Sequence, residues 1–247
     1  MTARVTELWR FPIKSHGREQ VAAVTLAPGQ TMPWDRVWAV AHEQSDADGR
    51  DWVPCQHFSR GSKAPGLGAI TAQVDEAAGT VTLSHPERED LTIDPDSDGP
   101  ALIDWAGGFV PETRARSARV VRGLTRGFTD SDFPSVTLCN MSSHRAVEQR
   151  FGRPLSIHRW RGNIWFDGAA PWEEFDWIDR EVQVGEAVLA VRERTDRCLA
   201  THNNPDTSRR DADVLGTLEG WEHQDFSVRA EVIRGGRVAP GDAVVRL

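Results

Sequence analysis

The sequence predicts a mainly β protein of the α+β class with few helices, and three observations support this. Short apolar runs recur along the whole chain, each of a length typical of strands. Glycine and proline fall between the runs, as in an antiparallel sheet or barrel. Only residues 142–151 resemble a helix. The length of 247 residues suits either one large β-rich domain or two small ones.

The first half is expected to consist of strands. Residues 3–11 alternate loosely, with Val5, Trp9 and Phe11 on one face. The other expected strands of this half share short length and flanking turn residues, and they are residues 21–27, 36–41, 67–74, 80–84 and 91–93.

Composition marks the junction between the two halves. Residues 94–99 form an acidic loop, and residues 111–117 are charged and poor in apolar side chains. A domain boundary is therefore expected between about residues 95 and 120. We expect two domains, residues 1–118 and 119–247.

The second half contains the one expected helix. Residues 142–151 could begin at a cap formed by Ser142 or Ser143, and Gly152 with Pro154 ends the helix. The remaining expected elements are strands, near Val120 and at residues 136–139, 162–167, 181–184, 187–193, 228–234 and 242–247.

Composition and charge narrow the classes of function. The net charge of −8 argues against bulk binding of nucleic acid or of an anionic membrane. No apolar run approaches the roughly 18 residues of a membrane helix, and the N-terminal segment lacks an apolar signal core. The three cysteines, Cys55, Cys139 and Cys198, form no C-x-x-C pair, so no disulfide framework or zinc finger is expected. We therefore expect a cytoplasmic protein with no nucleic-acid or membrane partner.

Cys198 is the candidate reactive residue. It lies in residues 195–215, an expected long loop without periodicity, and such loops are often functional. Its neighbour Arg197 favours the thiolate, the form that attacks carbon or sulfur and binds soft metals. A buried, inert cysteine is the alternative on these residues alone. His202, four residues further on, is a candidate proton donor.

Basic side chains could form an anion pocket in this otherwise acidic chain. The four candidates are Lys14, Arg36, Arg161 and Arg197. The alternative is that these charges are scattered over the surface. Ser142 and Ser143, at the expected helix start, would add N–H donors suited to a phosphate. Convergence of these groups would require the fold to bring distant segments together.

An ordered set of short motifs resembles one family. In chain order, the motifs are Phe11-Pro-Ile-Lys-Ser15, Asp35-Arg-Val-Trp38, Trp160-Arg-Gly-Asn-Ile164, Arg197-Cys198, Pro205-Asp-Thr207 and Gly241-Asp-Ala-Val244. This set resembles the MOSC family with its N-terminal β-barrel companion domain. That family includes the mitochondrial amidoxime-reducing component and the C-terminal domain of molybdenum cofactor sulfurase. The resemblance covers nearly the whole chain, and it implies an N-terminal barrel-like domain packed on a C-terminal MOSC barrel, with a positive cleft between them.

The resemblance also implies a molybdenum–molybdopterin cofactor and roles for particular residues. Cys198 would be the thiolate ligand of the metal, and Lys14 with Ser15 would contact the phosphate end of the pterin. Asp206 would shape the substrate face. The remaining implied cofactor contacts are Arg36, Ser142, Ser143, Arg161, Asn163 and Arg197.

The chain departs from the family pattern in four places. His16 stands where Cys or Arg is frequent, Cys55 with Gln56 stands where many members have Arg-Gln, and Ser208 replaces a common Gly. Residues 213–220 lack the basic side chains often found there. These departures bear on cofactor affinity and substrate class more than on the fold.

Two functions of different classes follow from the resemblance. The favoured one is an oxidoreductase whose molybdenum cofactor removes oxygen from a small N-hydroxylated or related N- or S-oxide substrate. Its electrons would come from a separate donor protein, because the chain lacks a ferredoxin-like extension. The alternative is a carrier that holds the cofactor, or a persulfide on Cys198, without turnover. A purely structural protein would leave the ordered motifs unexplained.

Overall fold

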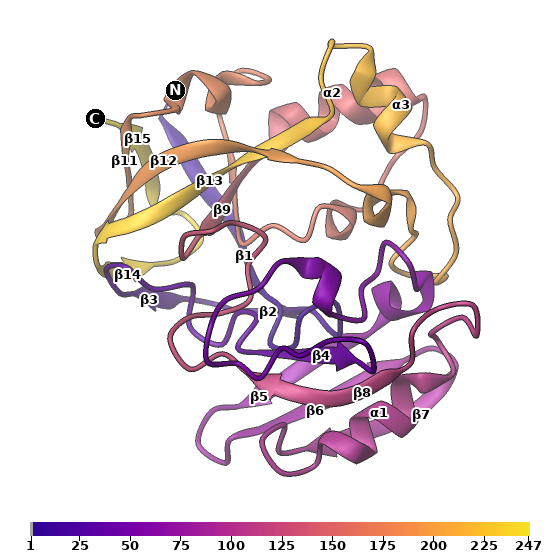
Figure 1. Cartoon of the computed structure of the whole chain (residues 1–247). Coiled ribbons are helices and arrows are strands. Elements are labelled where there is room, and N and C mark those ends of the chain that lie inside the picture. Colours follow the sequence, from indigo (N-terminus) through magenta and orange to yellow (C-terminus); the bar gives the residue numbers. More distant parts are fainter. Residues whose placement is uncertain (1) are drawn as a thin grey trace.

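Residues 2–247 are described by a computed structural model, in which two β-rich units stack on each other (Figure 1). The upper unit in this view holds both chain ends, and the lower unit is formed by the first half of the chain. The predicted fold class, mainly β with few helices, is confirmed.

The upper unit is a closed barrel of seven strands. In sheet order these are β10 (Ile164–Asp167), β9 (Val136–Asn140), β13 (Asp225–Arg234), β12 (Ala187–Asp196), β11 (Glu181–Val184), β15 (Ala243–Arg246) and β1 (Ala3–Arg10). Pairing of β1 with β10 closes the ring. Closure leaves no free edge among the seven strands.

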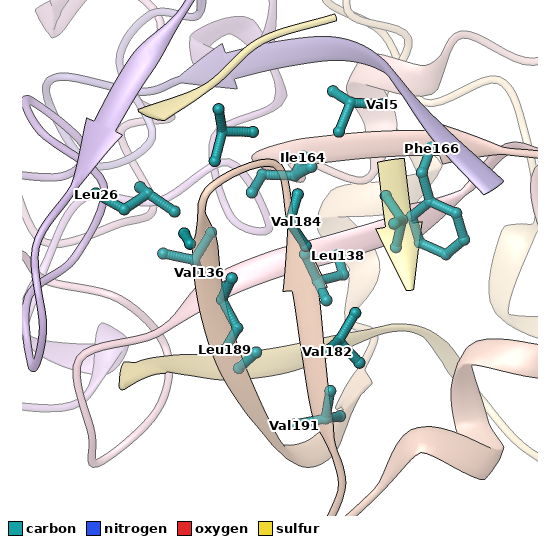
Figure 2. Packing of buried hydrophobic residues seen from close by; sticks show 14 of the residues in the cluster. Val5, Leu26, Val136, Leu138, Ile164, Phe166, Val182, Val184, Leu189 and Val191 are labelled. Atoms are coloured by element: carbon teal, nitrogen blue, oxygen red, sulfur yellow. The ribbon is translucent and has the colours of Figure 1, made fainter. Parts of the chain in front are cut away.

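Alternating apolar side chains fill the barrel. Along β1, buried and more exposed residues alternate with the period of two that a strand imposes. Val182, Val184, Leu189 and Val191 point from β11 and β12 into the interior, where they meet side chains of the opposite strands (Figure 2). All four side chains are fully buried, at 0% exposure, so this core is closed to water and is not a ligand site.

Shorter strands connect the barrel to its surroundings. β2 (Glu19–Gln20) pairs with β1, and β3 (Val24–Leu26) pairs with β14 (Gly236–Val238). The pairing of β3 with β14 joins the first part of the chain to its last part.

The lower unit contains two small sheets and one helix. β4 (Trp38–His42) pairs with β8 (Ser117–Arg122), and a meander forms from β5 (Thr71–Asp75), β6 (Thr80–His85) and β7 (Arg88–Ile93). Helix α1 (Gly99–Gly107) buries Leu102 and Ala106 in the core of this unit.

The expected domain boundary at residue 118 falls inside a strand of the lower unit. β8 spans residue 118 and pairs inside the lower unit, whereas β1 belongs to the barrel. The division into residues 1–118 and 119–247 stays a prediction of where an independent folding unit would end.

Helices are few and short within the described part of the chain. Besides α1, the α-helices are α2 (Met141–Phe151) and α3 (Val214–Glu219). Single 3₁₀ turns occur at η1 (Cys55–His57), η2 (Pro65–Ala69), η3 (Ile157–Arg159), η4 (Glu173–Trp177) and η5 (Leu199–His202). None of the helices formed by residues 2–247 combines the length and the apolar character needed to cross a membrane.

The expected helix is α2, but its cap differs from the prediction. The side chain of Asn140, not Ser142 or Ser143, accepts a hydrogen bond from the Ser142 N–H at 2.9 Å. Gly152 ends the helix with a left-handed φ of 88°, as its position predicted.

Candidate functional site

A cavity of about 180 Å³ lies between the two units. The first half of the chain contributes Lys14, Ser15, Arg36, Cys55, Arg60, Gly61 and Ser62 to its walls. The second half contributes residues from the segments 129–137, 159–161 and 195–201, together with Arg229. The cavity therefore forms only when the two units are packed together.

The cavity is strongly cationic, although the whole chain is acidic. Seven lining side chains are cations and two are carboxylates, in a protein of net charge −8. The cations are Lys14, Arg36, Arg60, Arg159, Arg161, Arg197 and Arg229, and the carboxylates are Asp130 and Asp196. The four basic residues singled out in the sequence thus converge, and Cys198 lies beside them.

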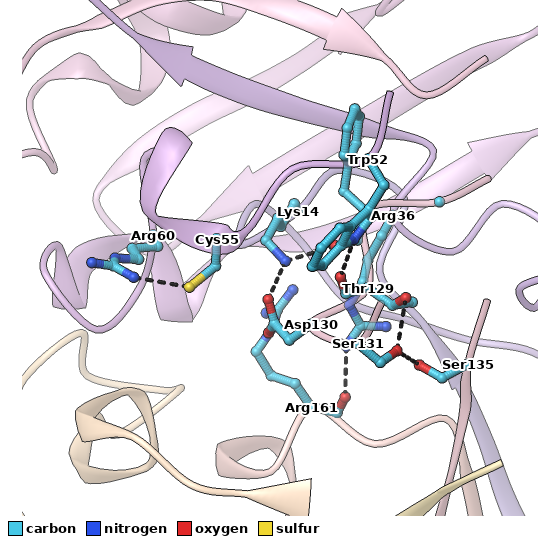
Figure 3. Close-up of polar contacts among 12 residues, drawn as sticks. Lys14, Arg36, Trp52, Cys55, Arg60, Thr129, Asp130, Ser131, Ser135 and Arg161 are labelled. Atoms are coloured by element: carbon cyan, nitrogen blue, oxygen red, sulfur yellow. Dashed lines mark hydrogen bonds and ion pairs between the residues drawn. The ribbon is translucent and has the colours of Figure 1, made fainter. Parts of the chain in front are cut away.

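Lys14 is a buried and paired cation on this wall. Its Nζ donates to the carbonyl oxygen of Phe128 at 2.6 Å and to the carboxylate of Asp130 (Figure 3). Burial lowers the pKa of Lys14, and Asp130 opposes that effect. Burial alone would raise the pKa of Asp130, but the adjacent Lys14 outweighs it and holds that pKa below its ordinary value.

Arg36 and Arg161 contact the ring of Phe11. Their guanidinium carbons lie 4.7 Å and 4.3 Å from the ring centroid. Arg36 also pairs with the buried carboxylate of Asp35 and donates to the backbone oxygen of Arg161 at 2.9 Å. Arg161, in contrast, is in no ion pair within residues 2–247. Burial, reinforced by Arg36, lowers its pKa to about 9, so it is still charged at neutral pH.

Both arginines have unusual backbone conformations. Arg36 has a φ of 55° and Arg161 a φ of 51°, in the left-handed region that non-glycine residues seldom adopt. Such conformations cost about 1–3 kcal/mol each and persist where the surrounding structure holds them, often at functional sites.

Arg197 fixes the segment that carries Cys198. Its guanidinium donates to the carbonyl oxygens of Phe226 and Trp160 and to the hydroxyl of Ser227, over 2.6–3.0 Å. Burial lowers the pKa of Arg197 to about 10. No carboxylate within residues 2–247 forms an ion pair with it, so its charge is balanced only by dipoles. Cys198 itself is exposed at the cavity edge.

The three cysteines have three different environments, and all are free. Cys139, on β9, is buried, and burial raises the pKa of its thiol to about 12, as suits an inert core residue. Cys55 is half-buried, and its sulfur accepts a hydrogen bond from Arg60 at 2.8 Å (Figure 3). Only Cys198 combines exposure with a place on the cationic cavity.

Ser142 and Ser143 do not reach this cavity. Ser143 Oγ donates to the buried carboxylate of Glu174 at 2.7 Å and accepts from the Trp172 N–H at 2.8 Å. Ser142 Oγ accepts from Arg145 at 2.8 Å. Their assignment as cofactor contacts stays a prediction, and the structure gives Ser143 a structural partner instead.

Asn163, His202 and Asp206 also lie away from the main cavity. Asn163 accepts from the Thr137 N–H and donates to the Trp9 carbonyl, both at 3.2 Å, so it supports a cavity wall from behind. His202 Nε2 accepts from the Leu215 N–H at 3.2 Å, and burial lowers its pKa. Asp206 is exposed. Their predicted roles in catalysis or cofactor binding are not tested by this geometry.

Several residues that line the cavity were not predicted from the sequence. Arg229 lies on β13 and bridges Glu193 and Asp196, at 2.7 Å and 2.9 Å. Ser135 belongs to a hydroxyl network in which Ser131 donates to it at 2.7 Å (Figure 3). The hydroxyl-rich stretch before β9 was an available signal for the second group, whereas nothing in the sequence singled out Arg229.

A cluster of metal ligands is absent from residues 2–247. No group of three or more His, Cys, Asp or Glu side chains could hold a metal ion there. A pterin-bound metal with one protein thiolate does not require such a group. The cations, the hydroxyls and the single exposed thiol fit an anionic pterin carrying its own metal-binding sulfurs.

Two family models match the chain. The MOSC domain matches residues 126–245, and the MOSC N-terminal beta barrel domain matches residues 2–103. Between them they leave residues 104–125 as the one internal segment that is unmatched.

One solved structure is similar in fold over nearly the whole chain, and two others match part of it. The crystal structure of the YUAD protein from Bacillus subtilis has a TM-score of 0.50 at 12% identity, covering 99% of this chain and 94% of that chain. The YiiM structures from Geobacillus stearothermophilus and Escherichia coli are 20% and 14% identical, with TM-scores of 0.34 and 0.35. Each match covers 45% of this chain and 53% of the YiiM chain. No curated protein matches this chain in sequence.

Proposed function

Because the chain belongs to the MOSC family, as its ordered motifs predicted, we propose that its cationic cavity binds a molybdenum–pterin cofactor with Cys198 as the metal ligand. One observation carries the proposal: seven cations and an exposed thiol, drawn from both units, converge on one cavity of an acidic protein. A pterin with a phosphate is an anion of matching charge.

Different residues would hold different parts of the cofactor. Lys14 and Ser15 would face the phosphate end, with Arg36 and Arg161 beside them. Arg161 is the best placed donor for an incoming anion, since within residues 2–247 its guanidinium makes one hydrogen bond, a long one of 3.3 Å to the Gly17 carbonyl. Asn163 would act indirectly by supporting the wall.

The chain also fixes the position of the proposed metal ligand. The carbonyl oxygen of Cys198 accepts from both the N–H and the hydroxyl of Thr201, at 3.1 Å and 3.0 Å. On the other side, the four hydrogen bonds of Arg197 hold the preceding residue to the barrel. Because the backbone is fixed on both sides of Cys198, its thiol loses little conformational entropy when it binds a metal.

The loaded protein is proposed to be a reductase. The cofactor, when bound, supplies the two-electron chemistry that accepts an oxygen atom. The substrate would be a small N-hydroxylated or related N- or S-oxide compound, which gains two electrons and two protons and releases its oxygen as water. The electrons would come from a separate donor protein.

A carrier function is the second candidate, and the exposure of Cys198 favours it. A thiol at the rim of a cavity can be reached by another protein, as delivery of a cofactor or of a persulfide sulfur requires. In this case the protein would bind its cargo without turnover.

Metal analysis tests the first candidate. The protein and its Cys198→Ser variant are produced in a host that makes the cofactor, and molybdenum per chain is measured. We expect near-stoichiometric metal in the parent and loss in the variant, with Cys55→Ser as a comparison that removes a thiol from the same cavity. Equal retention in Cys198→Ser contradicts the ligand assignment. Absence of metal from all three favours a carrier of a persulfide on Cys198, which sulfane-sulfur detection then tests.

A further inference from the structure

A small side chamber of about 40 Å³ adjoins the main cavity. The two share walls formed by Ser15, Gly61, Arg159, Arg161 and Ala200. The chamber continues under the segment that follows Cys198, where Asn203 and Pro205 line it. A molecule that reacts beside Cys198 could therefore extend one end into this chamber.

Arg159, which lines both the main cavity and the chamber, has a buried hydrogen-bond donor without a partner in residues 2–247. The residue is only 4% exposed. One terminal nitrogen donates to the carbonyl oxygens of Thr201 and His202, at 3.3 Å and 3.1 Å, and the other pairs with Asp211. Its Nε–H has no hydrogen-bond partner in the described part of the chain. A buried N–H without a partner is destabilising, and a ligand oxygen would relieve that penalty.

The charges around the chamber favour an anion. Arg161, on the shared wall, is in no ion pair within residues 2–247. The nearby carboxylates are already engaged: Asp211 also faces Arg153 at 3.4 Å, and Asp206 lies 3.6 Å from Arg18.

His158 adds a neutral ring to the chamber wall. Burial lowers its pKa to about 4, with Arg18 contributing, so it is uncharged at neutral pH. The chamber wall thus carries two guanidinium groups. Arg159 already pairs with Asp211, whereas Arg161 is in no ion pair within residues 2–247.

We infer that this chamber is a subsite for a carboxylate on the substrate, held by Arg159 Nε–H with Arg161 and Ser15 on the same wall. The inference rests on the proposed function and narrows its substrate class to N-hydroxylated, N-oxide or S-oxide compounds that also carry a carboxylate. The phosphate of the cofactor is another oxyanion. Its higher charge matches the seven cations of the main cavity, whereas the chamber offers one free N–H and a small volume.

Gly68 allows the chamber to be filled without removing a charge. It lines the chamber but not the main cavity. A Cβ placed there would meet only the Cβ of Asn203, at an ordinary 3.9 Å, so Gly68→Ala should fold while narrowing the chamber. Gly107→Ala is the matched control, because a Cβ at Gly107 has no neighbour within 4 Å. Arg159→Lys is a second variant, which keeps the positive charge and removes the Nε–H.

The test compares two probes, benzamidoxime and 4-carboxybenzamidoxime. Calorimetry on cofactor-free protein gives the two Kd values, and kcat/KM is measured on protein loaded with molybdenum. We expect the parent and Gly107→Ala to prefer the carboxylated probe by about tenfold, the scale of one charge-assisted hydrogen bond. In Gly68→Ala and Arg159→Lys this preference should fall to about one.

Each of the following results would contradict the proposed subsite. Equal affinity of the parent for the two probes does so, as does a preference that survives in Gly68→Ala. A Gly68→Ala protein that loses molybdenum but keeps its preference assigns the chamber to the cofactor. A crystal of the probe complex with only a water on Arg159 Nε also contradicts it.

Failure of the proposed function looks different. In that case no protein reduces either probe, yet the cofactor-free parent still binds the carboxylated probe more tightly, in a manner that depends on Gly68.

Discussion

The two walls of the cavity balance their positive charges in different ways. On the wall from the first half of the chain, Lys14 and Arg36 each form an ion pair, with Asp130 and Asp35. On the wall that carries Cys198, Arg161 and Arg197 are in no ion pair within residues 2–247. Arg60 on the first wall is also in no ion pair within residues 2–247, and Arg159 and Arg229 on the second wall are paired, so two of the three unpaired lining cations belong to the wall that carries the exposed thiol. We expect a lining cation that no carboxylate neutralises to contribute more to anion binding than a cation that is already paired.

Low pH should give the largest effect, a loss of folding stability caused by His16, which lies next to Arg161. This residue is fully buried. Burial, reinforced by Arg161 and opposed by the hydrogen bond that the His16 ring donates to the Lys14 carbonyl, lowers its pKa from 6.5 to about 4. The unfolded chain binds the proton more tightly, so stability is complete above pH 6.5 and falls as the pH decreases toward 4. The loss should reach about 3 kcal/mol.

Urea unfolding at several pH values measures this loss. We expect His16→Gln to lower the slope of stability against pH between 4 and 6.5 by about one proton. An unchanged slope in His16→Gln would show that other groups cause the acid sensitivity.

Removing the unpaired charge should weaken cofactor binding next most. Arg161→Gln deletes a guanidinium that no carboxylate balances, and we expect roughly 30-fold weaker binding, about 2 kcal/mol. Molybdenum retained during dialysis of the loaded protein is the measurement. Arg192→Gln, which changes an exposed arginine paired with Glu231, is the matched control. Equal retention in the two variants would break the comparison of the walls.

Ser143 tests whether the start of α2 belongs to the site. Because its hydroxyl is buried between Glu174 and the Trp172 N–H, Ser143→Ala should lower the free energy of unfolding by about 1–2 kcal/mol. Molybdenum content should stay at the parental level. A variant of normal stability that loses the metal would instead support the cofactor contact predicted from the sequence.

Lys14→Gln should weaken cofactor binding less than Arg161→Gln does. The charge of Lys14 is already paired with Asp130, so Lys14→Gln should weaken cofactor retention only about fivefold, or roughly 1 kcal/mol. The same dialysis measurement ranks it against Arg161→Gln. A larger loss for Lys14→Gln than for Arg161→Gln would reverse the proposed difference between the walls.

Strands were predictable because their signal is local. Alternation along residues 3–11 and the apolar runs at 80–84 and 181–184 correspond to β1, β6 and β11. α1 and α3 were not predicted: α1 begins with Gly-Pro and ends at Gly107, and α3 has only six residues with Gly216 inside. Each buries just two residues, so neither shows a helical apolar face.

Four of the seven cations of the site were predicted from motifs, namely Lys14, Arg36, Arg161 and Arg197, but their partners were not. Asp130 reaches Lys14 across 116 positions of sequence, and Arg159 reaches Asp211 across 52. Pairings over such separations are set by the fold and leave no local pattern. For the same reason, the sequence could not distinguish the paired Lys14 from the unpaired Arg161.

The place of β1 in the barrel has a consequence for biosynthesis. This strand is synthesised before its barrel neighbours, which are residues 164–167 and 243–246. It can pair early with β2, but the ring can close only after β10 and β15 have been synthesised. Slow translation or truncation near the C-terminus should expose this strand to chaperones, proteases or aggregation.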